Sequence, residues 1–156
     1  MSNRAYSTFA SVIDVALATN AFTDQHNLIY NPAAVLSRPS IYDILIGSSA
    51  TPADNATQWG VYRTATAPTG GTAITASPCD SNDPAASTLA MSKPTGASTL
   101  GVLLAYMSVN QRVTWRWCAV PGGELVVGAA AGAGIALVSV LCPTPAVMET
   151  TIFFRE

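Results

Sequence analysis

The sequence predicts an all-β fold, a jelly-roll-like antiparallel β-sandwich with long loops and one or two short helical turns. Proline and glycine recur along the whole chain, as at Asn31-Pro32 and Pro121-Gly122-Gly123, and divide it into short pieces. The stretches between them are rich in Val, Ile, Thr and aromatic residues and are mostly shorter than the ~10 unbroken residues of a typical helix. Several alternate apolar and polar residues with the two-residue period of a half-buried strand.

The N-terminal region is expected to hold an arm, residues 1–8, followed by a single β-sandwich domain at 9–156. Arg4 and Tyr6 stand out in the small and polar arm, which would order only against a partner; a frayed terminus without a role is an equal alternative. Residues 7–19 match a helical stripe as well as a strand face, and their β-branched content favours the strand.

Alternation predicts two strands in the first half of the domain. In residues 41–46, Tyr42, Ile44 and Ile46 share the expected core face. Residues 59–64 alternate in the same way, so each stretch should contribute one face to the core.

The clearest strand is residues 111–119. The two-residue period places Trp115 and Trp117 on its inward face, so both are predicted core residues. Arg112 and Arg116 fall on the opposite face, where they are available for contacts with other molecules.

Further elements follow from local patterns. Residues 99–109 are apolar on both faces and are predicted to form a hairpin with the strand after Asn110, as a central or covered strand. A last short strand is expected at 150–156. One helical turn is predicted at each of 51–54 and 83–86, where a Thr or Asp cap precedes a proline.

Residues 125–142 contain no charge over eighteen residues, and a membrane helix is the alternative to two strands there. Only eight of the eighteen are Leu, Ile or Val, and no Lys or Arg cluster flanks them to orient a span. We expect a turn at 121–124, a strand at 125–127, a small-residue loop and a strand at 135–141, and no membrane contact.

The charge content is the most informative property for function. Only seven residues are Lys or Arg and nine are Asp or Glu, about 10% of the 156, whereas soluble domains usually have about a quarter charged. Such a neutral surface favours association, so we interpret the chain as a subunit of an assembly. The net charge of -2 provides no basic footprint for nucleic acid.

No catalytic, cofactor or metal motif is recognisable, so an enzyme is not expected. The acidic residues are scattered singly, and His26 lies in a polar stretch that is predicted to be a loop. Cys79, Cys118 and Cys142 lack metal or redox spacing and are expected to be reduced and mostly buried thiols. The first residues do not resemble a signal peptide, so synthesis in a cytoplasm is expected.

Several scattered blocks resemble a group of small structural proteins of tailed bacteriophages, the capsid decoration or cement proteins. The blocks are Arg38–Gly47, Ala50–Asp54, Asp83–Ala86, Asn110–Trp117, Pro121–Leu125 and Phe153–Glu156. None is a mechanistic motif, and the first 35 residues show no match.

The resemblance implies a virion protein, made in the host cytoplasm, that binds the outer surface of a phage head and stabilises the shell. Its partners would be its own copies, as a trimer rather than a dimer, and the major capsid protein. Residues proposed for these interfaces are Arg4, Tyr6, Phe9, Arg112 and Arg116. The alternatives are a β-sandwich binding module of the sugar-binding or adhesin type, with Trp59, Tyr62 or Tyr106 as an aromatic platform, and a small membrane protein.

Overall fold

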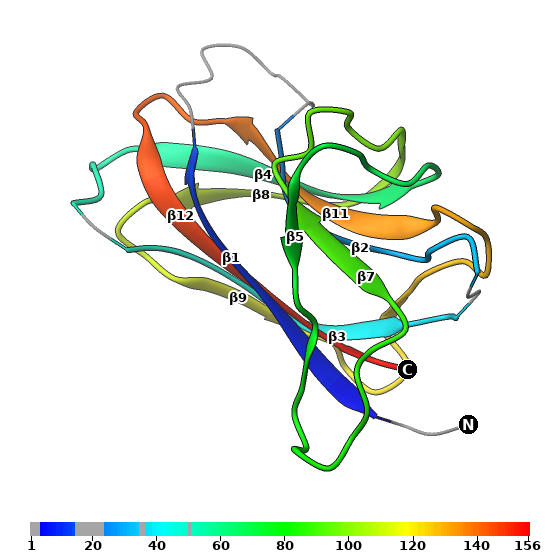
Figure 1. Ribbon diagram of the computed structural model, residues 1–156. Helices are drawn as coiled ribbons and strands as arrows, with labels where there is room; N and C mark the ends of the chain where they lie inside the picture. Colours follow the sequence, from blue (N-terminus) through cyan, green and yellow to red (C-terminus); the bar gives the residue numbers. More distant parts are fainter. Residues whose placement is uncertain (1–3, 15–23, 35–36, 50) are drawn as a thin grey trace.

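The computed structural model describes residues 4–14, 24–34, 37–49 and 51–156. In these residues the chain forms two antiparallel β-sheets and no helix, with one hydrophobic core between the sheets (Figure 1). The predicted all-β sandwich is confirmed. The jelly-roll connectivity stays a prediction.

The first sheet, here called sheet I, is built around the C-terminal strand. Its strands, in spatial order, are β10 (Leu125–Val126), β3 (Ser40–Ser48), β12 (Ala146–Arg155), β1 (Ala5–Asp14) and β6 (Ser77–Pro78), with β9 (Trp115–Cys118) paired to β3. β12 alternates buried and partly exposed residues along its whole length, as expected for a strand with one face on the core.

The second sheet, sheet II, has strands that are more deeply buried. Its spatial order is β5 (Thr72–Ile74), β7 (Leu89–Ser92), β2 (Asp24–Tyr30), β11 (Gly134–Leu141), β4 (Ala56–Thr64) and β8 (Leu100–Asn110). Every residue of β2 is buried, and so is every residue of β11 except the last. Burial on both faces explains why β11 is apolar at every position except Ser139 and does not alternate between apolar and polar residues.

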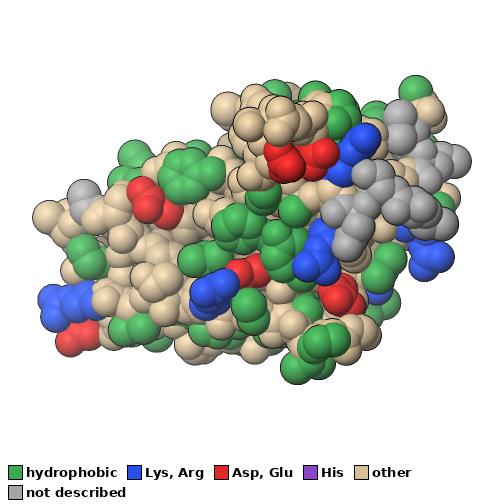
Figure 2. All heavy atoms as spheres, turned by 90° about the horizontal axis from the view of Figure 1, so that it is seen from below, with side chains coloured by type: hydrophobic (Ala, Val, Ile, Leu, Met, Phe, Trp, Pro, Cys, Tyr) green, Lys and Arg blue, Asp and Glu red, His purple; other side chains and the backbone are tan. Residues whose placement is uncertain are grey.

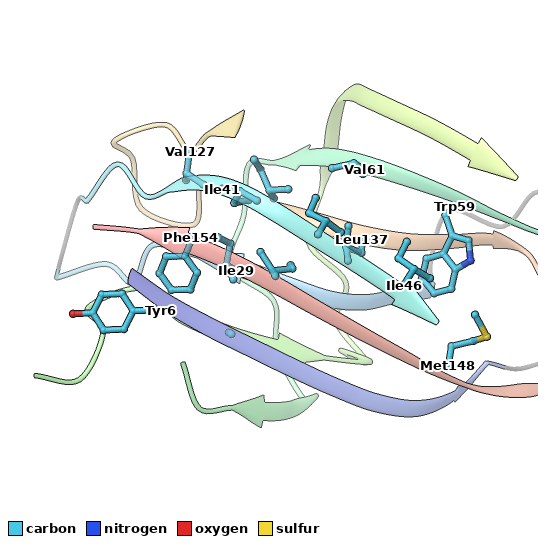
Figure 3. Close-up of a cluster of buried hydrophobic side chains, with 14 of the residues drawn as sticks. Tyr6, Ile29, Ile41, Ile46, Trp59, Val61, Val127, Leu137, Met148 and Phe154 are labelled. Atoms are coloured by element: carbon cyan, nitrogen blue, oxygen red, sulfur yellow. The ribbon is translucent and has the colours of Figure 1, made fainter. Parts of the chain in front are cut away.

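The core fills the space between the sheets. Inward side chains of both sheets meet there, with Tyr6 and Phe154 at one end and Trp59 and Met148 at the other (Figure 3). A second, smaller cluster lies on the other face of sheet II and consists of Leu28, Tyr30, Tyr62, Ala136, Val138 and Val140.

The predicted pattern for 125–142 is confirmed. A turn leads into β10, a loop follows, and β11 returns through sheet II. No helix among the described residues is long and apolar enough to cross a membrane.

Neither predicted helical turn forms, because its capping groups have other partners. Thr51 has a φ of 40°, in the left-handed region, whereas an N-cap residue has β-region angles. The N–H of Ala53 donates instead to Gln111 Oε1 at 2.9 Å. At 83–86, Asp83 forms an ion pair with Arg4.

The predicted hairpin of 99–109 with the following strand is wrong. β8 pairs with β4 at the end of sheet II, and β9 pairs with β3 in sheet I. The strand predicted at 111–119 is reduced to Trp115–Cys118, because residues 111–113 form the turn between the sheets. β8 is therefore an edge strand and not a central one.

The region 7–19 is a strand as far as Asp14, and its remainder lies outside the described residues. The predicted arm is wrong for residues 5–8, which form the first part of β1. Ala5–Thr8 pair with β12 in continuous register, and Tyr6 and Ser7 also pair with β6. These residues belong to sheet I because their backbone hydrogen bonds are made within the domain.

Candidate functional site

The residues predicted for interfaces do not form one surface. Tyr6 is a core residue, 1% exposed, whose ring stacks on Phe154 with centroids 5.6 Å apart. Phe9 points to the opposite side of β1 and is 55% exposed. Arg4 and Arg112 are exposed and form ion pairs within the chain. Of the five, Phe9 is the one that offers an accessible apolar side chain.

Arg116 is a partner of a buried carboxylate. Its guanidinium binds both oxygens of Asp43, with Nε 3.0 Å from each, while the Asp43 side chain is 6% exposed. The pair lies on the outer face of sheet I, where β9 crosses next to β3. Arg116 therefore compensates the burial of Asp43 and is not simply a free surface charge.

The predicted core tryptophans are half-buried. Trp115 and Trp117 lie on β9, which pairs with β3 in sheet I, and their side chains point inward and pack against the core cluster. The fully buried tryptophan is Trp59, and its indole N–H donates to Thr57 Oγ1 at 3.0 Å. Both β9 tryptophans thus contact the core from its margin, and its centre is filled by a different ring.

No aromatic platform of the expected kind forms from the three candidate residues. Trp59 is fully buried, and Tyr62 is 8% exposed within the cluster on sheet II. Tyr106 is exposed, and its hydroxyl donates to Gln58 Oε1 at 2.6 Å. These positions leave one accessible ring, which weakens the sugar-binding or adhesin alternative.

His26 is not in a loop but inside the sandwich. The register of β2 against β11 shifts by one residue between Gln25 and Asn27, so that His26 is the extra residue of β2. The side chains of His26 and Asn27 both contact groups in the interior. His26 Nδ1 lies 3.1 Å from Thr150 Oγ1, and its ring packs edge-on against Trp59 at 5.3 Å. The polar stretch 24–27 forms a strand because its side chains have partners there.

The electrostatics of His26 indicate a structural role. Burial, followed by the positive charge of Lys93, lowers the pKa of the imidazole to about 4. The ring is fully buried and neutral near pH 7, and it lines neither the groove beside Phe9 nor the one beside Ile13. This arrangement joins the two sheets but gives a substrate no access to the ring.

Neither metal-site geometry nor grouped thiols are present in the described part of the chain. No three His, Cys, Asp or Glu side chains there lie close enough to hold a metal ion. The cysteines are all free thiols, but only Cys142 is buried, whereas Cys79 and Cys118 are exposed. The prediction of mostly buried thiols is therefore wrong for two of the three.

At least half of the charged residues are neutralised by ion pairs within the chain. At least four of the seven Lys and Arg residues form ion pairs, which are Arg4 with Asp83, Lys93 with Asp24, Arg112 with Asp54 and Arg116 with Asp43. The face shown in Figure 2 has hydrophobic side chains gathered near its middle, with acidic and basic side chains beside them. The accessible surface thus presents few unbalanced charges.

Exposed apolar side chains gather on one strand. Val102 is 65% exposed, Leu103 44% and Tyr106 46%, and all three belong to β8. The sequence indicated the apolar character of this stretch. It did not reveal that the strand lies at the edge of sheet II.

A shallow groove lies between β1 and β5. Its lining includes Phe9, Ser11, Thr72 and Ile74, and it contains no charged side chain among the lining residues. Small and neutral groups of this kind do not define a particular ligand.

Comparison with protein-family models, curated proteins and solved structures finds no match for this chain.

Proposed function

We propose that this chain is a structural virion protein, a decoration or cement protein that binds the outside of a tailed-phage head as a homo-oligomer. The observation that carries the proposal is the neutral surface of a folded sandwich that still exposes apolar strand positions. At least four cations are used in internal ion pairs, while Phe9 and β8 present apolar side chains.

Permanent interfaces between structural subunits suit such a surface. The buried centres of these interfaces are depleted in charge and rich in apolar and aromatic side chains. A cement protein gains its total affinity from many repeated contacts on a shell, so it needs no deep ligand pocket. The buried His26 has a role in the fold, and four of the acidic residues form ion pairs within the chain.

Virions that carry this gene provide the test. Gold-labelled antibodies against the purified chain should bind the outer surface of intact heads, and deletion of the gene should make the heads release DNA at a lower temperature. Addition of the purified protein to the deletion particles should restore their stability.

Two outcomes would contradict this function. One is absence of the chain from purified particles, and the other is labelling confined to tails or to broken heads. The variant Phe9→Glu is a matched comparison, because Phe9 is exposed and the single added negative charge should spare the fold while weakening the restored stability of the heads.

A further inference from the structure

β8 has a free edge along its whole length. It is the terminal strand of sheet II and pairs only with β4 among the described strands. Its register against β4 shifts near Tyr62, whereas Ala105–Asn110 pair regularly with the first half of β4. An edge of this kind leaves backbone donors and acceptors available to another strand.

The hydrogen bonds of the adjoining turn show which backbone groups point outward. The N–H of Gln111 donates to Asn55 O at 3.0 Å, so Gln111 faces β4. Backbone groups of successive residues in a strand point to opposite edges, so those of Val109 and Met107 face β4 as well. The N–H and C=O groups of Tyr106 and Ser108 therefore point to the free edge.

The side chains of β8 are compatible with pairing to an identical strand. Residues 100–110 contain no charged residue, so two copies would meet without like charges in opposition. The cation of the neighbouring strand β4 is Arg63, and its guanidinium binds within the chain, where Nη1 donates to Val126 O at 2.6 Å. Other free edges are short, as in β5 with three residues.

We propose that β8 pairs with β8 of a second copy in antiparallel orientation, so that the two copies of sheet II form one continuous sheet. The carbonyl of Asn110 already accepts a hydrogen bond from the N–H of Val113 in the adjoining turn. The register that pairs the outward N–H and C=O groups of Tyr106 and Ser108 with one another is centred on Met107. In this register Tyr106 of each copy lies opposite Ser108 of the other, and a large ring packs over a small side chain.

Antiparallel pairing of identical strands has twofold symmetry. The interface therefore predicts a dimer, or an assembly built from dimers, in place of the trimer that the family resemblance implies. The inference rests on the homo-oligomer of the proposed function but not on attachment to a phage head.

Ser108→Pro tests the pairing because proline removes an N–H that the isolated domain does not use. Proline is tolerated on an edge strand where the N–H faces solvent, and its ring would block the partner. Ser108→Ala keeps the N–H and is the matched control. Light scattering should give twice 16.1 kDa for the wild type and for Ser108→Ala, and 16.1 kDa for Ser108→Pro.

Amide hydrogen exchange of the wild type gives a second measurement that does not depend on folding of a variant. The amides of Tyr106 and Ser108 should be protected from exchange at high protein concentration. Their exchange rates should rise at least tenfold when the protein is diluted to the monomer. The amide of Met107 should stay protected at both concentrations.

The outcomes separate the two proposals. An oligomer that persists in folded Ser108→Pro, or unprotected Tyr106 and Ser108 amides in a wild-type oligomer, overturns β8 pairing and leaves the cement function standing. A β8 dimer that does not label phage heads overturns the function and leaves the pairing. A wild type that is monomeric at all concentrations overturns the pairing.

Discussion

The imidazole of His26 in β2 and the hydroxyl of Thr150 in β12 join the two sheets inside the sandwich, with Nδ1 3.1 Å from Oγ1. Neighbouring polar contacts extend this link. Asn27 Nδ2 donates to Thr150 O at 3.4 Å, and Thr8 Oγ1 lies 3.5 Å from Asn27 Oδ1. The polar groups fix how β2 sits against β1 and β12 because each would lose stability if buried without a partner.

The first prediction is acid destabilisation through His26. Its pKa is lowered from 6.5 to about 4 in the folded protein, so between these pH values the unfolded chain binds more protons. The free energy of unfolding should fall by about 3 kcal/mol as the pH drops from 6.5 towards 4, and this contribution should be intact above pH 6.5. Urea titrations at a series of pH values measure it.

His26→Gln is the control for this prediction, since it removes the titrating group and keeps a polar side chain. The gap in stability between wild type and variant should shrink as the pH falls from 6.5 towards 4. A gap that stays constant over this interval would show that other groups cause the acid sensitivity.

The second prediction concerns two glycines in the small-residue loop and the strand after it. A Cβ on Gly134 would lie 2.2 Å from the Ile29 carbonyl oxygen, whereas a Cβ on Gly128 would find its nearest neighbour, Ala133 Cβ, at 3.8 Å. Gly134→Ala should cost about 3 kcal/mol or more because backbone must move, and Gly128→Ala should change stability by less than ~0.5 kcal/mol. Equal thermal midpoints for the two variants would disprove this account of the backbone packing.

The third prediction ranks the tryptophans. Trp59 is fully buried and Trp117 is half-buried. Trp59→Ala should lower the free energy of unfolding by roughly 3–5 kcal/mol. Trp117→Ala should lower it by less, because less of the Trp117 ring is buried and its removal leaves a smaller cavity. Denaturant midpoints measure the order, and a costlier Trp117→Ala would place the centre of the core at β9.

The fourth prediction compares two arginines. Arg116 binds Asp43, whose side chain is 6% exposed, whereas Arg112 and Asp54 are both well exposed at 58% and 71%. Arg116→Ala should therefore lower the melting temperature more than Arg112→Ala, because it leaves a buried carboxylate without its cation.

A double variant checks the reason for this difference. Adding Asp43→Asn to Arg116→Ala removes the uncompensated charge and should recover part of the lost melting temperature. No recovery would mean that Arg116 acts through the packing of its aliphatic chain and not through the carboxylate.

Local alternation was enough to predict several strands and the fold class. The strands at 41–46 and 59–64 were predictable because the side chains of a strand alternate between its faces, a property of neighbouring residues alone. The strands within 125–141 were predictable from the turn that precedes them and the small-residue loop that separates them. β-Bulges limited how well the inward-facing and outward-facing residues of a strand could be predicted. The register of β3 against β12 shifts between Ile41 and Asp43, so Tyr42 lies on the outer face and not in the core.

The low charge content of the chain and the position of most of its strands thus follow from local residue patterns. The tertiary structure decided which strands became neighbours, and with them the fate of the candidate residues. It placed Tyr6 in the core, His26 between the sheets and β8 at an edge. Pairing between strands depends on contacts far apart in the chain, and the residues of one stretch do not specify whether a neighbour will cover its edge.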